Sequence, residues 1–117
     1  MTPNKKIIEA YYASKGTEYA GCLADDVELV EWADGVPPKG IQTHGKTAFV
    51  ENRGTRDYGT EIARMTEENN VVVVEGTARG AKKDGGSWQV EFCDIFELEN
   101  GKVNRLRAFG ASVKDGA

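Results

Sequence analysis

Residues 88–96 are expected to form a β-strand with one apolar face and a single acidic exception. Turn-forming residues lie on both sides of it, Asp-Gly-Gly at 84–86 and Asn-Gly at 100–101, and both are typical of tight hairpins. We therefore expect this strand to pair antiparallel with the segments before and after it. Every second side chain of a strand points to the same face. Here that face holds Trp88, Val90, Phe92, Asp94 and Phe96.

Asp94 is the exception on this face. A buried carboxylate is costly unless it is paired, hydrogen-bonded or protonated. One interpretation is structural, with Asp94 paired to an arginine such as Arg79 on a neighbouring strand or bonded to a helix terminus. The other is functional, with Asp94 as a working acid inside an apolar space. Both stay open at the level of sequence.

The other elements change type along the chain, with helices first and strands later. Thr2 and Pro3 predict a helix start, and Gly16 predicts its end. A second short helix is expected after Thr17 and a third at 46–53. Asp25-Asp26 is read as a turn. Strands are expected at 27–32, 60–66, 71–79 and 103–113, and a Pro- and Gly-rich loop at 33–45.

This order predicts an α+β fold, in which three N-terminal helices cover the concave face of a strongly curved antiparallel sheet. Gly76 and Gly80 are candidate bulges or kinks that would bend the sheet into a cone. At 117 residues, the chain is expected to be a single domain, 1–117.

Charge and composition exclude several classes of protein. The formal net charge is -4 and the basic residues are scattered, which argues against nucleic acid or an anionic membrane as partner. Two cysteines, Cys22 and Cys93, make no disulfide framework, and no Cys/His cluster predicts a metal site. We expect reduced thiols, no signal peptide, no membrane span and a cytoplasmic location.

A second carboxylate lies at the end of another apolar strand face. In 27–32 the alternate residues Val27, Leu29 and Glu31 share one side. If this face and that of Asp94 line one space, the two acids could act as a pair, one accepting protons and the other donating a hydrogen bond to an oxyanion. Tyr11 or Tyr12 from the first helix could supply a second donor.

Several motifs in this order resemble the nuclear transport factor 2-like superfamily, which includes ketosteroid isomerases and SnoaL-type polyketide cyclases. They are Ala-Asp-Asp-Val at 24–27, His-Gly-Lys at 44–46, the run 94–103 and Arg-Ala-Phe-Gly at 107–110. The resemblance covers nearly the whole chain. It implies the cystatin-like roll, a homodimer formed through the outer sheet face, and no cofactor.

The resemblance to ketosteroid isomerase also implies roles for three residues. Asp94 matches the protonated, oxyanion-binding aspartate, and Glu31 lies near the general base, where the family has an aspartate. Tyr12 is the best match for the oxyanion tyrosine. The implied substrate is a small apolar molecule with a ring, and the side chains expected to bind it, or alternatively to fill the core, are Trp88, Phe92, Phe96, Leu106 and Ala108.

Other chemically conspicuous residues have plainer interpretations. His44 is expected at the surface or as a helix cap. Trp32 points to the strand face opposite that of Glu31 and is expected in a subunit contact. Cys93 is expected to be a buried small apolar residue. Arg105 and Arg107 are assigned to a solvated or subunit-contacting sheet face.

Three functions fit these observations. The first is a cofactor-independent isomerase or cyclase that acts on a ring-containing carbonyl compound, with Glu31, Asp94 and Tyr12 as the catalytic residues. The second is a non-catalytic protein that binds a small apolar ligand. The third is an interaction module whose interior is filled by its own side chains. Fold alone does not separate them.

Overall fold

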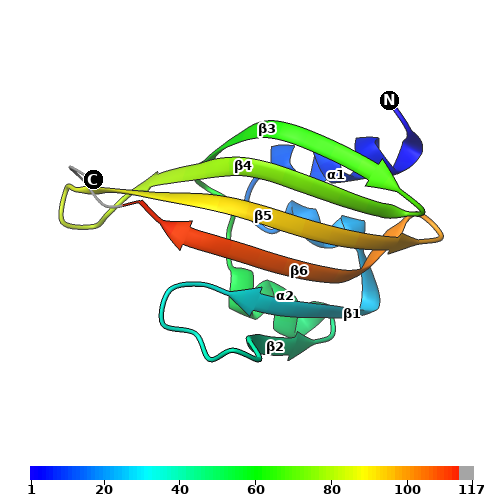
Figure 1. The fold of residues 1–117 in the computed structure, drawn as a ribbon, viewed down its shortest axis with the longest axis horizontal. Helices are drawn as coiled ribbons and strands as arrows, with labels where there is room; N and C mark the ends of the chain where they lie inside the picture. Colours follow the sequence, from blue (N-terminus) through cyan, green and yellow to red (C-terminus); the bar gives the residue numbers. More distant parts are fainter. Residues whose placement is uncertain (114–117) are drawn as a thin grey trace.

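A computed structural model describes residues 1–113. In this range one six-stranded sheet is combined with two α-helices and a short 3₁₀ helix, η1. Figure 1 shows the sheet in front of the helices. The elements are α1 (Pro3–Ala13), η1 (Glu18–Cys22), β1 (Leu23–Trp32), β2 (Ile41–His44), α2 (Lys46–Arg53), β3 (Gly59–Glu68), β4 (Val71–Ala81), β5 (Ser87–Glu99) and β6 (Lys102–Ser112).

Helix α1 begins where the sequence predicts. The side chain of Thr2 accepts a hydrogen bond from the backbone N–H of Lys5 at 3.2 Å, and Pro3 occupies the first turn. The helix ends at Ala13, before the predicted stop at Gly16, because Ser14 already has an extended backbone.

The expectation of three α-helices is wrong for the second one. Residues 18–22 form the 3₁₀ helix η1. This segment is only five residues long before the chain enters β1, and 3₁₀ turns are common in such short connectors. The third predicted helix, α2, has the predicted bounds 46–53.

The strands lie in the order β2-β1-β6-β5-β4-β3. Strands β3 to β6 are joined by antiparallel hairpins, and the predicted turns at 84–86 and 100–101 lie between them. The expectation of a wholly antiparallel sheet is wrong at one place, because β1 pairs with β6 in parallel. These two strands are distant in sequence, so no tight turn forces them to be antiparallel.

The first two strands also differ from expectation. Asp25 and Asp26 lie within β1 and form no turn, although the β1–β6 register shifts between Leu23 and Glu28. The predicted loop contains β2, which pairs antiparallel with β1 at the sheet edge. A four-residue edge strand between Gly40 and Gly45 shows too little periodicity to be recognised from sequence.

Gly76 lies opposite an irregularity in β3. The β3–β4 register shifts between Ile62 and Arg64, and Ile62 pairs with Gly76. A Cβ atom at Gly76 would lie 2.5 Å from the backbone oxygen of Glu61 and 2.9 Å from the ring of Phe92. The glycine therefore allows a close approach of strand and ring at a bulge.

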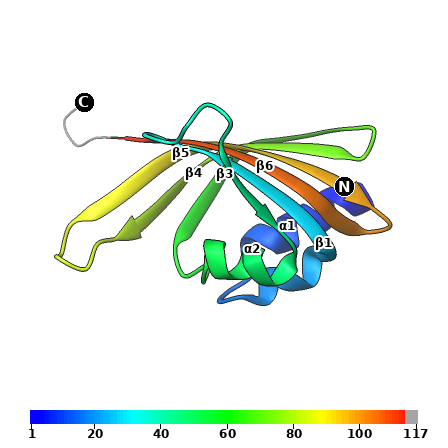
Figure 2. The same cartoon turned by 90° about the horizontal axis from the view of Figure 1, so that it is seen from below.

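The sheet bends around the helices, and both α-helices lie on the same side of it (Figure 2). The residues of the core are fully or almost fully buried between these layers. Neither α-helix in residues 1–113 has the length and apolar character that a membrane crossing requires. The core includes Ile8, Tyr11, Tyr19, Leu23, Val27, Leu29, Phe49, Val72, Val74, Phe96, Leu98, Val103 and Leu106.

Candidate functional site

A cavity with a volume of about 280 Å³ opens beside this core. Its walls come from α1, the end of α2, the 54–58 segment and strands β1, β3, β4, β5 and β6. Most of its lining is aromatic or small. The side chains in it that carry charge or an acidic proton are Tyr11, Tyr12, Glu31, Arg53, Arg56, Tyr58 and Asp94.

Asp94 and Tyr12 form a hydrogen bond in this cavity. The hydroxyl of Tyr12 donates to Oδ2 of Asp94 over 2.5 Å. Asp94 is only 7% exposed, and the ring of Tyr12 stacks on Phe92, the neighbour of Asp94 on the same strand face. The strand alternation predicted from sequence therefore holds, and the partner of Asp94 is a helix tyrosine. Arg79 pairs with Glu61 at 3.3 Å instead.

Burial favours the protonated forms of both groups. It raises the pKa of the Asp94 carboxyl, against the opposing effects of Arg53, of the Tyr12 hydrogen bond and of Arg56. Burial also raises the pKa of the Tyr12 hydroxyl well above its usual range, and Asp94 adds to this. Both shifts act toward protonated, uncharged groups inside a poorly solvated space.

Glu31 faces the same cavity from β1. Its Oε2 lies 3.5 Å from Nε of Arg53, and each side chain is 23% exposed. In the β1–β6 register Glu31 is opposite Ala108, and in the β5–β6 register Asp94 is opposite Ala108. The two acids are therefore two strands apart, about 10 Å between backbones. Ala108 forms the floor between them.

Arg53 and Arg56 also line this cavity, but neither was predicted from the sequence to be a site residue. Arg53 follows Phe49 by four residues in α2, so the apolar residue and the cation share a helix face, a signal that could have been used. Burial lowers the pKa of Arg53, but Tyr11, Asp94 and Glu31 outweigh this and raise it overall.

Arg56 lies in the short segment between α2 and β3, and its backbone N–H donates to the carbonyl of Gly16 at 2.8 Å. Tyr58, in the same segment, packs edge-on against Trp88 with 5.3 Å between ring centroids. Nothing in the local sequence predicts that these loop residues line the cavity.

The residues predicted to bind substrate divide into two groups. Trp88, Phe92 and Ala108 line the cavity. Phe96 and Leu106 do not, because both are fully buried in the core, where Phe96 packs against Tyr11 with 5.2 Å between ring centroids. They lie on the predicted strand face, but deeper under α1, where side chains close the interior.

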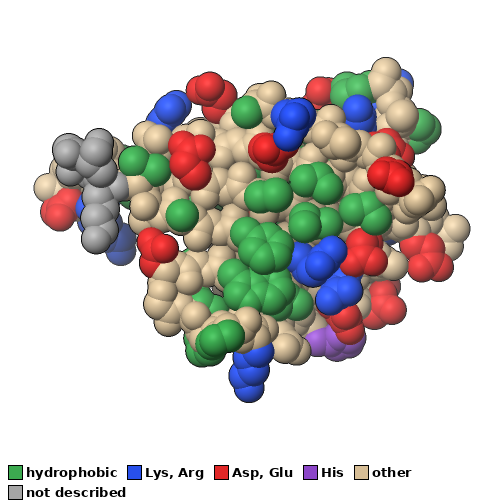
Figure 3. All heavy atoms as spheres, in the orientation of Figure 1, with side chains coloured by type: hydrophobic (Ala, Val, Ile, Leu, Met, Phe, Trp, Pro, Cys, Tyr) green, Lys and Arg blue, Asp and Glu red, His purple; other side chains and the backbone are tan. Residues whose placement is uncertain are grey.

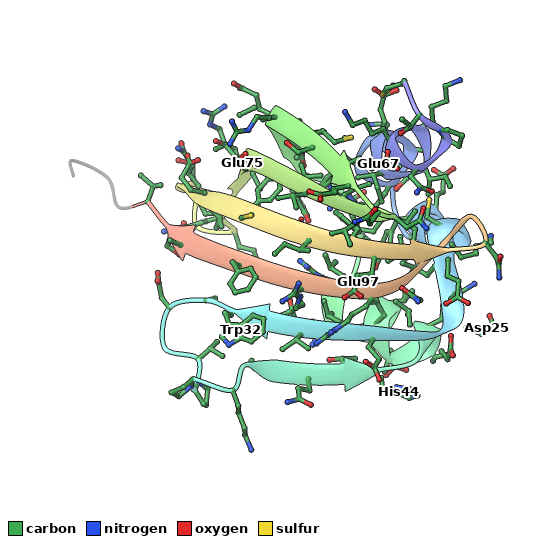
Figure 4. The ribbon with its side chains drawn as sticks, turned by 45° about the vertical axis from the view of Figure 1, so that its right-hand side comes forward. Asp25, Trp32, His44, Glu67, Glu75 and Glu97 are labelled. Atoms are coloured by element: carbon green, nitrogen blue, oxygen red, sulfur yellow. The ribbon has the colours of Figure 1, made fainter. Side chains whose placement is uncertain are left out.

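Trp32 and His44 lie at opposite ends of the β1–β2 edge (Figure 4). Trp32 stacks on Phe109 with 4.6 Å between ring centroids, and it also lines the cavity. His44 is a surface residue, 3.8 Å from Glu28, and the cap of α2 is Gly45.

The remaining conspicuous residues lie away from the cavity. Cys93 is half-buried, and burial raises the pKa of its thiol. Arg105 pairs with Glu97 at 3.5 Å. In the part of the chain that the structure describes, no three His, Cys, Asp or Glu side chains gather as metal ligands would.

The fold agrees with comparison to known families. The model of the SnoaL-like domain matches residues 5–106. The chain belongs to this family, which is part of the nuclear transport factor 2-like superfamily. A search of curated proteins finds no match.

Solved structures share the fold at low sequence identity. A phenazine biosynthesis-related protein from Pseudomonas aeruginosa is 22% identical with a TM-score of 0.76, covering 92% of this chain and 75% of its own. TerC, crystallised with polyporic acid, is 21% identical with a TM-score of 0.73, covering 92% and 90%. A nuclear transport factor 2-like protein of unknown function from Burkholderia pseudomallei is 22% identical with a TM-score of 0.70, covering 92% and 90%.

Proposed function

We propose that this protein is a cofactor-independent acid/base enzyme, an isomerase or cyclase acting on a ring-containing carbonyl compound. The observation that carries the proposal is the buried Asp94–Tyr12 pair, which lies in the same cavity as Glu31. Neutral donors beside an acceptor of protons are what enolate chemistry requires.

The proposed roles are those of the ketosteroid isomerases that the sequence resembles. Glu31 accepts a proton from the carbon next to the carbonyl. The electrons of the broken C–H bond form a C=C bond, and the carbonyl oxygen becomes an enolate oxygen. The Asp94 carboxyl donates a hydrogen bond to this oxygen, and Tyr12 turns to supply a second one. In a compound with a C=C bond between the β and γ carbons, return of the proton to the γ carbon shifts the double bond and isomerises the compound. In a compound with a second carbonyl, attack of the enolate carbon on that carbonyl closes a ring, and the new alkoxide takes the proton back from Glu31.

The size of the cavity bears on the substrate and on the alternatives. Its volume of about 280 Å³ is just below the range of about 300–1,000 Å³ that is usual for ligand sites. We therefore favour a one- or two-ring compound over a tetracyclic steroid. An open volume of this size also argues against an interaction module filled by its own side chains. A non-catalytic ligand-binding protein remains the second candidate, because the same cavity would serve it.

Deuterium exchange of a bicyclic ketone separates the two candidates. 2-Tetralone in D2O is followed by proton NMR with the wild type and the variants Glu31→Gln and Asp94→Leu. The enzyme is expected to accelerate exchange next to the carbonyl, and Glu31→Gln to lower the rate about 10²- to 10⁴-fold. Asp94→Leu should abolish exchange and still bind the ketone. Arg64→Gln, on the exposed surface of β3, is the matched control. If the wild type exchanges the ketone no faster than buffer alone, the proposed enzyme is excluded and the ligand-binding protein is the candidate that remains.

We also propose that the outer face of the sheet joins two copies of the chain, as the resemblance implies. A hydrophobic patch lies in the middle of this face (Figure 3). Phe109, stacked on Trp32, is 37% exposed, and aromatic side chains are enriched at interfaces. Sedimentation equilibrium should give twice the mass of the chain, and Phe109→Lys should shift it toward the monomer. A wild-type monomer at high concentration would rule the dimer out.

A further inference from the structure

Arg56 is a buried cation without a carboxylate partner. Its side chain is 8% exposed, and its two terminal nitrogens donate to the hydroxyl oxygens of Tyr58 and Thr60, each over 2.9 Å. Among residues 1–113, no carboxylate lies within 4.0 Å of it. Its interactions are with neutral groups, although a buried charge is normally compensated by an opposite one.

Aromatic rings surround this guanidinium. Its central carbon lies 5.2 Å from the ring centroids of Tyr11 and Tyr12 and 5.0 Å from that of Tyr58. Cation–π contacts of this kind hold the guanidinium in place. They carry no net negative charge, so the charge of Arg56 remains available to a ligand in the cavity.

Arg53 has unused donors in the same cavity. Its Nε lies 3.5 Å from Oε2 of Glu31, an ion pair without hydrogen-bond geometry, and its Nη2 is buried with no hydrogen-bond partner among the described residues. Buried side-chain N–H groups nearly always have a partner. Two guanidiniums that line one cavity, one with a donor lacking a partner and one without a carboxylate, are a site for an anion with more than one acceptor oxygen.

The charges around the cavity leave room for one negative charge. Arg53 and Arg56 contribute two positive charges and Glu31 one negative charge. Burial raises the pKa of Asp94, and the proposed mechanism uses its protonated, uncharged form. A monoanion would then balance the site, whereas a phosphate dianion would exceed it.

We propose that the cavity binds ring compounds that carry a carboxylate, with Arg56 and Arg53 holding the carboxylate and the rings lying along Trp88 and Phe92. This inference rests on the proposed function for the identity of the site, and it changes the expected substrate from an apolar ring compound to a ring-containing keto acid. Arginine fits because its planar fork matches the two oxygens of a carboxylate.

A matched pair of probes tests the charge preference on the wild-type protein. 2-Naphthoate and 2-naphthamide have the same rings and differ in charge, and their binding is measured by calorimetry at low ionic strength. We expect naphthoate to bind about tenfold or more tightly than naphthamide, because hydrogen bonds to a charged group are the stronger ones. The difference should shrink with added salt.

Two variants assign this preference to the arginines. Arg56→Gln and Arg53→Gln should each weaken naphthoate binding about tenfold and change naphthamide binding less than twofold. Arg64→Gln removes an exposed arginine that pairs with Glu75 on the sheet, and it should change neither. Circular dichroism of each variant confirms that it is folded, and the comparison of the two probes on the wild type stands without the variants.

Equal affinity for the two probes, or no binding of naphthoate, would overturn the inference. The exchange experiment tests the proposed enzyme, and the binding experiment tests the carboxylate site, so each result is judged independently. Exchange of neutral 2-tetralone without a preference for naphthoate would leave the proposed enzyme and remove the carboxylate site. A clear preference for naphthoate, with no exchange of 2-tetralone or of a tetralone carboxylic acid, would leave the carboxylate site and remove the proposed enzyme.

Discussion

Glu31 and Asp94 stand opposite the same residue, Ala108, from the strands on either side of β6. The parallel pairing of β1 with β6 and the antiparallel pairing of β5 with β6 bring the two acids to this level of the sheet. Ala108 is 8% exposed and lines the cavity. Its small side chain leaves the space between the acids open.

Ala108→Leu should close this space. The larger side chain would extend between the two carboxyl groups, so we expect binding of naphthoate to weaken about tenfold or more, with a stability loss of about 1–3 kcal/mol from overpacking. Calorimetry and urea unfolding measure the two effects. Ala111→Leu, at an exposed position of the same strand, is the control and should leave binding unchanged. Unchanged binding in Ala108→Leu would place the ligand elsewhere.

Asp94→Asn should change the pH dependence of stability. The pKa of Asp94 is higher in the folded chain than in the unfolded chain, so the unfolded chain releases this proton at lower pH. The wild type therefore loses stability as the pH rises from the unfolded-state pKa, about 4, through the folded-state pKa. Asparagine removes this loss, which is about 1.4 kcal/mol for each pKa unit. Urea unfolding from pH 4 to 8 should show that the free energy of unfolding of the variant increases relative to that of the wild type as the pH rises. A constant difference would mean an ordinary pKa for Asp94.

Tyr12→Phe should raise the pKa of Asp94 further. The hydrogen bond from Tyr12 lowers that pKa, so its removal acts in the opposite direction. Carboxyl-selective NMR titration of both proteins measures the shift. Tyr19→Phe removes a different buried hydroxyl, one that donates to the carbonyl of Gly54, and should leave Asp94 unaffected. A lower pKa in Tyr12→Phe would contradict the hydrogen bond.

Gly76→Ala should destabilise the fold by about 1–3 kcal/mol, the usual range for overpacking. The added Cβ would lie 2.5 Å from the backbone oxygen of Glu61, so β3 or β4 would have to move. Gly21→Ala is the matched control, because a Cβ there meets no atom within 4 Å. Thermal unfolding of both variants makes the comparison, and equal melting temperatures would show that the bulge adapts freely.

Leu106→Ala should act through the core and lower the free energy of unfolding by about 2–5 kcal/mol. Leu106 is fully buried and is absent from the cavity lining, although its strand face predicted a binding residue. Trp88→Ala, in the lining, should instead weaken binding of both naphthalene probes. A Leu106→Ala protein of wild-type stability would show that this residue lies outside the core.

Local sequence signals accounted for much of the fold. The Thr2 cap, the Asn100-Gly101 turn and the alternation from Trp88 to Phe96 depend on near neighbours or on a fixed period, so they can be read without knowing the rest of the chain. For the same reason the sequence put Asp94 on the inner face. The short helix expected after Thr17 is a five-residue 3₁₀ helix, and the four-residue edge strand was missed, because both segments are too short to show a clear period.

Only the tertiary structure decided what surrounds Asp94. The parallel β1–β6 pairing sets Glu31 level with it, and the paths of α1 and of the 54–58 segment bring Tyr12 and Arg56 to the same cavity. Pairing between distant strands and the docking of loops depend on burial and hydrogen bonding across the whole molecule, which leave no local period in the sequence. The sequence by itself determined that an acid faces the interior, and long-range packing determined its tyrosine, glutamate and arginine neighbours.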